Sequence, residues 1–422
     1  MYRDTLSLLG PVLPVVSFLG RLPTAMCQLG SLILVAETSG SLTTAGLAGG
    51  ALAAGQTVAG PVIGRLADRR GQRGVVLIAS LANAVAVAAL VLAALAHAAT
   101  GWLIALGALA GATVPQVGPL ARTRSVALAR RSGADDRLVG TVLSFEGTLD
   151  EVSFVLGPAL VGLAAALTHP AAALLTASAL LATCGSAFAL HSSARGAEGR
   201  ATAVTTRTGA AERARLPRSA YALRITMVLQ GAMFGTSQAG ITALTERLGA
   251  PEQAGLVYAA MGVMSAAVGL SMAAVPARIG LPLRWRTATA ALVVLSVPLL
   301  FVDSLVALYV VVVVLGAAYA PHLITVFGLT ERTVPAIRLA ESMAFLTSGI
   351  VGGQALALAL AGSLAERHGP GAAFTVMVGA AVLCAALSWS VRTRLPAAGT
   401  RPAGAEAATE AGEAATEAGV RT

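Results

Sequence analysis

The chain contains few of the residues that cover the surface of a soluble protein. Only 12% of its 422 residues are charged, lysine is absent, so that all 29 basic residues are arginine, and aromatic residues make up 4%. Hydrophobic residues make up 56%, and the mean hydropathy is +0.78. Such a composition excludes an ordinary soluble domain and is typical of a polytopic membrane protein.

Several functional classes lack the residues they need. Cys27, Cys184 and Cys384 lie in apolar runs at no metal-ligand spacing, so we expect small core residues and no metal site. No GxxxxGK[ST] string, HExxH string or nucleophile elbow is present, so we expect neither an ATPase nor another enzyme, and no cofactor. The arginines are dispersed over loops without interleaved aromatic residues, which argues against nucleic acid as a partner.

Long apolar runs fill the rest of the chain. A helix that crosses the bilayer needs about 20 mostly apolar residues, and it satisfies its own backbone hydrogen bonds in lipid. The sequence therefore predicts an all-α membrane protein with twelve transmembrane helices. The expected spans are 11–36, 43–63, 75–96, 101–121, 139–167, 171–191, 223–246, 254–275, 287–303, 305–329, 339–364 and 371–391.

The spans divide into two groups of six. Residues 192–222 have no apolar face and predict a cytoplasmic linker between an N-terminal bundle, 1–191, and a C-terminal bundle, 223–391. Residues 392–422 are low in complexity and predict a disordered cytoplasmic tail.

The two halves correspond to each other in sequence. An offset of 209 places Glu37 on Glu246, and an offset of 195 places Glu146 on Glu341. We infer an internal repeat, which is typical of transporters, and expect two pseudo-symmetric six-helix bundles.

The arginines predict the orientation. If the N-terminus is cytoplasmic, 26 arginines fall on the cytoplasmic side, only Arg247 and Arg367 fall outside, and Arg21 lies within the first span. Cytoplasmic loops carry an excess of positive charge, so we expect both termini in the cytoplasm. Arginine without lysine, together with abundant alanine, suggests a GC-rich bacterial genome and hence the bacterial plasma membrane.

A charged segment joins the second and third spans. Five of the ten residues from Gly64 to Arg73 carry a formal charge. Gly64 and Gly71 allow a tight turn and a close approach of helices, while Asp68 can face the positive N-terminal end of a neighbouring helix. One interpretation is an ordinary basic turn that follows the positive-inside rule; the other is a latch.

This segment resembles the signature loop of the major facilitator superfamily, and the span count, the 6+6 division and the long central loop extend the resemblance to the whole chain. The resemblance implies two bundles that rock about a central substrate site, driven by an ion gradient or by the substrate's own gradient. It also implies that Asp68 braces the inner gate against the start of span eleven, near Leu339 to Ser342. The gating positions are Gly64, Asp68, Arg69, Gly71 and Arg73.

The second half repeats this turn without its acid. At the offset of 209, Asp68 falls on Ala277, whereas Arg69 falls on Arg278. We therefore predict that Asp68→Asn impairs transport far more than any single change near Arg278.

Ionisable groups inside a bilayer are costly, so each is a candidate functional group. Span five carries Glu146, Asp150 and Glu151, the first two on one helical face. Arg21 lies at a similar depth in span one and can pair with Asp150 or Glu146 if the two spans are neighbours. Two hypotheses follow: the cluster binds and releases protons because two acids share one cation, or it is a static ion pair that fixes helix packing.

Gly157, Pro158 and Gly162 in span five resemble an incomplete Gly-Pro motif of proton-coupled drug exporters, with Ser153 and Val161 where that motif has glycine. The resemblance favours export over import. The alternative is close helix packing by small residues around a proline.

Polar groups in the spans that line the pathway of this superfamily are candidate substrate contacts, although each can equally link helices by hydrogen bonds. They are Gln28, Thr113, Gln116, Gln230, Ser237, Gln238, Tyr319, His322 and Thr325. His322 is either a structural hydrogen-bonding residue or a proton relay. Few aromatic residues argue against a sugar, and the lack of a cavity arginine cluster argues against a phosphorylated substrate. A small neutral or weakly cationic organic molecule fits better.

These features predict a monomeric secondary transporter in the lipid bilayer that moves a small organic solute by alternating access, as proton-coupled efflux. The alternatives are an importer of a small metabolite and a non-transporting membrane sensor or scaffold. Solute flux in proteoliposomes distinguishes a transporter from a sensor.

Overall fold

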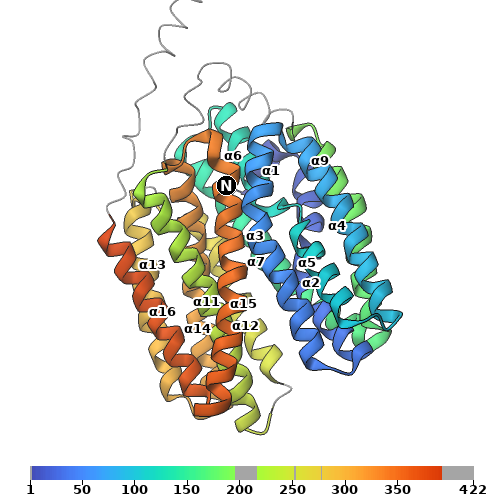
Figure 1. Ribbon diagram of the computed structural model, residues 1–422. Helices are drawn as coiled ribbons and strands as arrows, with labels where there is room; N and C mark the ends of the chain where they lie inside the picture. The colour runs from blue at the N-terminus through green and yellow to red at the C-terminus, as the bar shows by residue number, and fades with distance from the viewer. Residues whose placement is uncertain (1, 195–215, 251–252, 277, 392–422) are drawn as a thin grey trace, which may run out of the picture.

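The computed structural model describes residues 2–194, 216–250, 253–276 and 278–391. Long helices run side by side in two groups (Figure 1), and the described residues contain no strand. Most of the predicted linker and all of the predicted tail lie outside the described residues.

Six of the predicted spans form the N-terminal bundle. Its helices are α1 (Tyr2–Leu9), α2 (Val12–Ser39), α3 (Leu42–Arg70), α4 (Gln72–Leu95), α5 (Thr100–Ala112), α6 (Val117–Arg131), α7 (Asp136–Leu167), α8 (Pro170–Leu180) and α9 (Ser186–Leu190). A π-helical turn, Leu181–Gly185, joins α8 to α9.

The other six spans form the C-terminal bundle. Its helices are α11 (Arg218–Arg247), α12 (Ala254–Ser271), α13 (Leu281–Ser296), α14 (Leu305–Thr333), α15 (Leu339–His368) and α16 (Pro370–Ser390). The bundle also contains three short 3-10 turns: η4 (Met272–Ala274) follows α12, η5 (Val297–Phe301) follows α13, and η6 (Ala336–Arg338) precedes α15.

Eleven helical segments in the described chain are long and apolar enough to cross a membrane. The remaining predicted span, the seventh, 223–246, lies within α11, a 30-residue helix of more polar composition that packs against α15 and α16. At about 1.5 Å per residue this helix is long enough to cross the bilayer. The predicted fold class, an all-α membrane protein of two six-helix bundles, is confirmed.

Three local predictions need correction. The predicted fourth span, 101–121, is not one helix, because α5 ends at Ala112 and α6 begins at Val117. The charged segment is mostly helical: α3 continues to Arg70, and the turn is reduced to Gly71, whose φ of 88° favours glycine. The linker ends earlier than residue 222, since α11 begins at Arg218.

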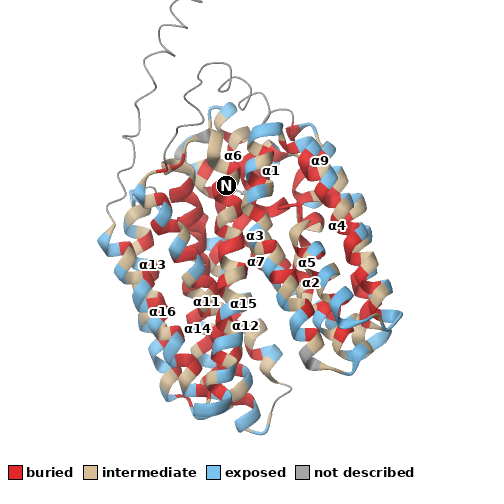
Figure 2. Ribbon diagram, in the orientation of Figure 1, coloured by how far each residue is buried: buried red, intermediate tan, exposed pale blue. Residues whose placement is uncertain are grey.

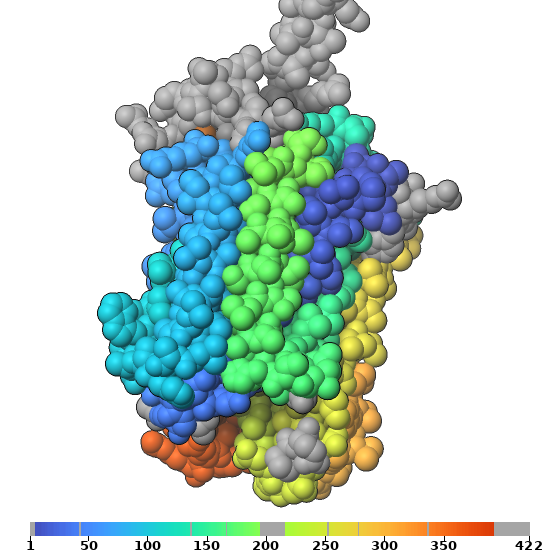
Figure 3. All heavy atoms as spheres, turned by 90° about the vertical axis from the view of Figure 1, so that its right-hand side faces the viewer, coloured from blue at the N-terminus to red at the C-terminus, as the bar shows by residue number. Residues whose placement is uncertain are grey.

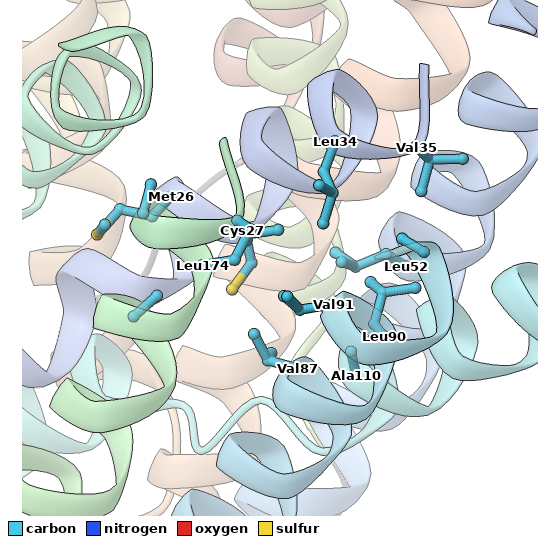
Figure 4. Packing of buried hydrophobic residues seen from close by; sticks show 14 of the residues in the cluster. Met26, Cys27, Leu34, Val35, Leu52, Val87, Leu90, Val91, Ala110 and Leu174 are labelled. Atoms are coloured by element: carbon cyan, nitrogen blue, oxygen red, sulfur yellow. The ribbon is translucent and has the colours of Figure 1, made fainter. Parts of the chain in front are cut away.

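Each bundle has its own apolar core. In the N-terminal bundle, Leu34 and Val35 of α2 pack with Leu52 of α3 and Val91 of α4 (Figure 4). The corresponding cluster of the C-terminal bundle joins α11, α12, α14 and α16. Buried residues lie between the helices and exposed residues on their outer faces (Figure 2). Many of those exposed residues are apolar, as a lipid-facing surface requires.

The two bundles contact each other mainly through α3 with α15 and α7 with α12. The helices of the two bundles lie close together near the α3–α4 turn and diverge toward the opposite end (Figure 1). We call the first end the arginine-rich end, because Arg69, Arg73, Arg130 and Arg338 lie there. The face in Figure 3 is formed largely by the N-terminal bundle, with α8 and α9 as a green column beside α4.

Candidate functional site

Asp68 connects the two bundles at the arginine-rich end. Its Oδ1 accepts a hydrogen bond from the backbone N–H of Ala340 at 3.1 Å, and its Oδ2 accepts one from the N–H of Glu341 at 2.8 Å. Both N–H groups belong to the first turn of α15, which has no intrahelical acceptor for them and carries the positive end of the helix dipole. One carboxylate thus caps a helix of the other bundle.

An ion pair lies next to this cap. Arg338 Nη2 lies 2.9 Å from Glu341 Oε1, and its Nε donates to Glu341 Oε2 at 3.1 Å. The hydrogen bonds with Glu341 raise the pKa of Arg338. Arg69 and Arg73, also predicted gating residues, are exposed at the end of α3 and the start of α4.

Small residues bring α3 and α15 into close contact. A Cβ added to Gly64 would lie 2.7 Å from the Cβ of Ala344 and 2.8 Å from the backbone oxygen of Ala340. Ser348, buried farther along α15, donates a hydrogen bond to the backbone oxygen of Gln56 at 3.3 Å. By contrast, a Cβ added to Gly50 would meet no atom within 4 Å. Close contact is therefore concentrated in the part of α3 nearer the arginine-rich end.

We expect Gly64→Val to force the two bundles apart at this interface. The new side chain would meet backbone atoms of α15, and overpacking of this kind costs about 1–3 kcal/mol, roughly a five- to 150-fold shift toward the separated state. A cysteine at Ser348, with Cys184 replaced by alanine, reports this shift through its rate of labelling by a membrane-impermeant maleimide. Gly50→Val on the same helix is the matched control, and an equal effect there would refute the steric explanation.

Three buried charges and the partly buried Asp150 form a network inside the N-terminal bundle. Arg21 Nη2 lies 2.6 Å from Glu146 Oε2, and Arg21 Nη1 lies 2.7 Å from Asp150 Oδ1. The second oxygen of Asp150 lies 2.5 Å from Arg122 Nη2. Glu146 Oε1 accepts a further hydrogen bond from Ser125 at 2.7 Å. Two cations therefore balance two acids, rather than one cation shared between them.

Arg122 is the residue of this network that the sequence analysis missed. It was assigned to a loop, but α6 extends to Arg131 and buries it completely. Its guanidinium nitrogens make no hydrogen bond of ordinary geometry, and the group lies 3.7 Å above the ring of Phe327 in α14. Charge and ring contact thus hold Arg122, and the network reaches the other bundle through Phe327. The sequence did contain a sign of this burial: apolar residues occur on both sides of Arg122 and continue the helix.

Glu151 faces away from these four charges, toward the C-terminal bundle. On α7, Thr148 lies near Gly269 of α12 and Val155 lies near Gly262. Glu151 lies between Thr148 and Val155 on the same face of α7. Ser265, midway between the two glycines of α12, is a neighbour of the Glu151 carboxyl. The Ser265 hydroxyl forms no hydrogen bond of ordinary geometry. Glu151 therefore lies in the interface between the bundles.

No ion pair with Glu151 is found among the described residues, and its side chain is 8% exposed. Asp150 on its own helix and Arg122 of α6 act on it electrostatically, as do the hydroxyls of Tyr258 and Tyr319. Of the three acids in span five, it is the one without a bound cation.

The interruption between α5 and α6 lies beside the network. Residues 113–116 are not helical, and Gln116 has a φ of 54°, an uncommon conformation for a residue with a side chain. The α6 helix begins immediately afterwards, and a Cβ on Gly118 would lie 2.9 Å from Asp150 Oδ1. Asp150 thus lies against the N-terminal turn of α6, where the helix dipole favours negative charge.

Three candidate substrate contacts are enclosed in the C-terminal bundle. His322 Nδ1 lies 2.6 Å from Gln230 Oε1, and His322 Nε2 lies 3.5 Å from the Sγ of Cys384. The Tyr319 hydroxyl is 3.2 Å from the Ser237 hydroxyl. Gln230, Tyr319 and His322 have no exposed surface, so in this conformation they link α11, α14 and α16.

The remaining candidates differ in exposure. Gln28, Thr113 and Gln238 are partly exposed, and the Nε2 of Gln28 lies 3.5 Å from Gln56 Oε1. Gln116 and Thr325 are buried. The structure does not gather the candidates into one site.

The Gly-Pro fragment lies in an uninterrupted part of α7. A Cβ on Gly157 would lie 2.7 Å from the Cβ of Ala25 in α2, whereas one on Gly162 would meet nothing within 4 Å. Pro158 lies inside the helix, which continues to Leu167. Gly157 therefore sets the close packing of α7 on α2.

No group of three or more His, Cys, Asp or Glu side chains that could hold a metal ion occurs in the described part of the chain.

A comparison with curated protein sequences finds no match. The fold is shared with solved structures. The human organic anion transporter MFSD10 (TETRAN) matches with a TM-score of 0.66 and 19% identity, over 92% of this chain and 99% of that one.

The second structure, a bacterial homologue of the iron transporter ferroportin in an outward-facing state with soaked iron, has a TM-score of 0.65 and 15% identity. The match covers 90% of this chain and 98% of that one. Residues 6–340 match the Major Facilitator Superfamily. The chain therefore belongs to the major facilitator superfamily and is a multi-pass membrane transporter.

Proposed function

We propose that the protein is a secondary active transporter that moves a small organic solute by alternating access, with protons as the coupling ion. The observation that carries the proposal is the pair of interfaces between the bundles, α3 with α15 and α7 with α12. Each is held by small residues and a few polar groups rather than by a continuous apolar core. Interfaces of this kind can separate without exposing a large apolar surface to water.

The conformation is closed at the arginine-rich end. By the positive-inside rule this end is cytoplasmic, and the closed gate then faces the cytoplasm of a bacterial cell. The Gly157 and Pro158 fragment favours export over import. A small neutral or weakly cationic solute remains the best substrate class, because partly exposed Gln28, Thr113 and Gln238 offer uncharged polar contacts.

Glu151 is the proton-binding residue in this proposal. Glu146 and Asp150 are both paired with arginine, so either one loses an ion pair when it takes up a proton. Glu151 has no such pair, and a buried carboxylate without a bound cation is costly. The protonated form therefore fits the packed α7–α12 interface, and the ionised form favours its separation.

We expect Glu151→Gln to remove the pH dependence of opening. In the otherwise unchanged protein with the Ser348→Cys reporter, the labelling rate should rise with pH more steeply than that of a freely exposed cysteine, whose reactive thiolate fraction also increases with pH. The excess is at most about tenfold per pH unit for one proton. Glutamine mimics the protonated acid, so in this variant the excess should be absent, and labelling relative to the exposed cysteine should stay slow at every pH. Glu366→Gln, which changes an exposed acid on α15, is the control.

Transport itself is tested in proteoliposomes with an imposed pH gradient and a panel of small neutral and weakly cationic organic solutes. Uphill solute movement that collapses with the gradient supports the proposal. Movement toward the opposite side identifies an importer, and binding without any flux identifies a sensor. Retained proton-driven accumulation in Glu151→Gln contradicts the assignment of Glu151.

A further inference from the structure

A cavity lies between the two bundles at the arginine-rich end. It has a volume of about 150 Å³. One wall comes from α7, and the other from η4, the start of α13 and the end of α14. Because both bundles contribute, any molecule bound there contacts both of them.

The lining of this cavity is amphipathic. Three arginines, Arg137, Arg284 and Arg332, contribute to it, against one acid, Glu331. Glu331 also lies 3.6 Å from Arg130, which is outside the cavity. The cationic side chains therefore outnumber the acid, and an anionic group is favoured.

The rest of the lining is mainly apolar, with Leu143 of α7 and Met272 and Ile324 from the other bundle. Thr325 also lines this part; its side chain is 1% exposed, and its hydroxyl has no hydrogen-bond partner in the described protein. A buried hydroxyl without a partner is costly. A ligand with an oxygen atom beside an apolar chain would satisfy it.

We propose that this cavity binds an anionic phospholipid. The arginines would hold the phosphate, and the apolar part would hold the ester linkage and the first carbons of one acyl chain. A cavity of roughly 150 Å³ accommodates a group about the size of benzene, so the rest of the lipid lies in the bilayer. Basic pockets between transmembrane helices on the cytoplasmic side suit such headgroups, whereas a free phosphate would leave the apolar part unfilled.

Binding would stabilise the conformation described here, because the lipid contacts α7 on one side and α13 and α14 on the other. It would be lost when the bundles separate at this end. Anionic lipid should therefore slow opening, independently of any solute.

The test uses the full chain in nanodiscs of phosphatidylcholine with and without phosphatidylglycerol, and native mass spectrometry to measure retained lipid. Each arginine near a headgroup contributes about fivefold in affinity, so Arg137→Gln combined with Arg332→Gln should weaken phosphatidylglycerol binding about 25-fold. Arg284 is left unchanged, since it donates to the backbone oxygens of Ile279 and Pro276 and so supports the loop. The control is Arg278→Gln, an exposed arginine of that loop outside the cavity.

A second variant tests the cavity without changing charge. A Cβ on Gly140, which lines the cavity, meets no atom within 4 Å, so a side chain can start there without strain, and Gly140→Leu adds apolar volume at the cavity wall and suits a helix better. We expect it to abolish phosphatidylglycerol retention, and expect phosphatidylglycerol to slow Ser348→Cys labelling in the parent but not in this variant. The proposal is overturned if Arg278→Gln weakens binding as much as the double change, if Gly140→Leu binds normally, or if inorganic phosphate displaces the lipid.

Discussion

Asp68→Asn should open the arginine-rich end. Asparagine keeps one acceptor oxygen but places an amide N–H₂ against the backbone N–H of α15, so one of the two hydrogen bonds is lost along with the charge. Hydrogen bonds to charged groups contribute about 1.5–3 kcal/mol, so the equilibrium between closed and open states should shift roughly 10- to 150-fold. The labelling rate of the Ser348→Cys reporter measures this shift.

The second half of the chain supplies the control. Arg278 is the repeat counterpart of Arg69, and it is exposed. Arg278→Gln should leave the labelling rate within about twofold, as expected for a surface substitution. Similar rates for the two variants would show that Asp68 belongs to an ordinary basic turn. Solute flux, once a substrate is known, should fall in the Asp68 variant because a transporter that cannot close one side cannot complete its cycle.

The fold was predictable because the membrane leaves few choices. Apolar runs of about 20 residues can only be spanning helices, and the run at 223–246 predicted α11 even though that helix is comparatively polar. Helix ends were less predictable. The interruption at residues 113–116 lies within an apolar run, and Pro115 there gave no clear sign whether the helix bends or stops.

The environment of each side chain depended on the rotation of each helix about its axis, which packing determines. Gln230 and His322 were plausible cavity residues by depth, but their helices turn them toward each other. Arg122 was assigned to a loop, because a charge at the end of an apolar run is normally the end of the span. The inferred difference between Glu146 and Glu151 also requires the structure, since it depends on which face of α7 meets Arg21 and which meets α12.

Arg21→Met should strongly destabilise the N-terminal bundle. It removes one of two cations from a buried network and leaves Glu146 without a paired cation, while Asp150 keeps Arg122. Removal of one partner from a buried ion pair costs about 3–5 kcal/mol. Thermal unfolding of the purified protein, followed by intrinsic fluorescence, should show the largest decrease in Tm of any variant considered. Arg247→Gln, an exposed arginine at the opposite end, should change Tm little.

A double substitution separates a static role from a role in proton transfer. Arg21→Met combined with Glu146→Gln restores the charge balance, because Asp150 keeps Arg122 as its partner. If the network only fixes packing, the double variant should recover much of the lost stability and retain the pH dependence of Ser348→Cys labelling. If the recovered protein has instead lost that pH dependence, the network itself carries the proton, and Glu151 does not act alone.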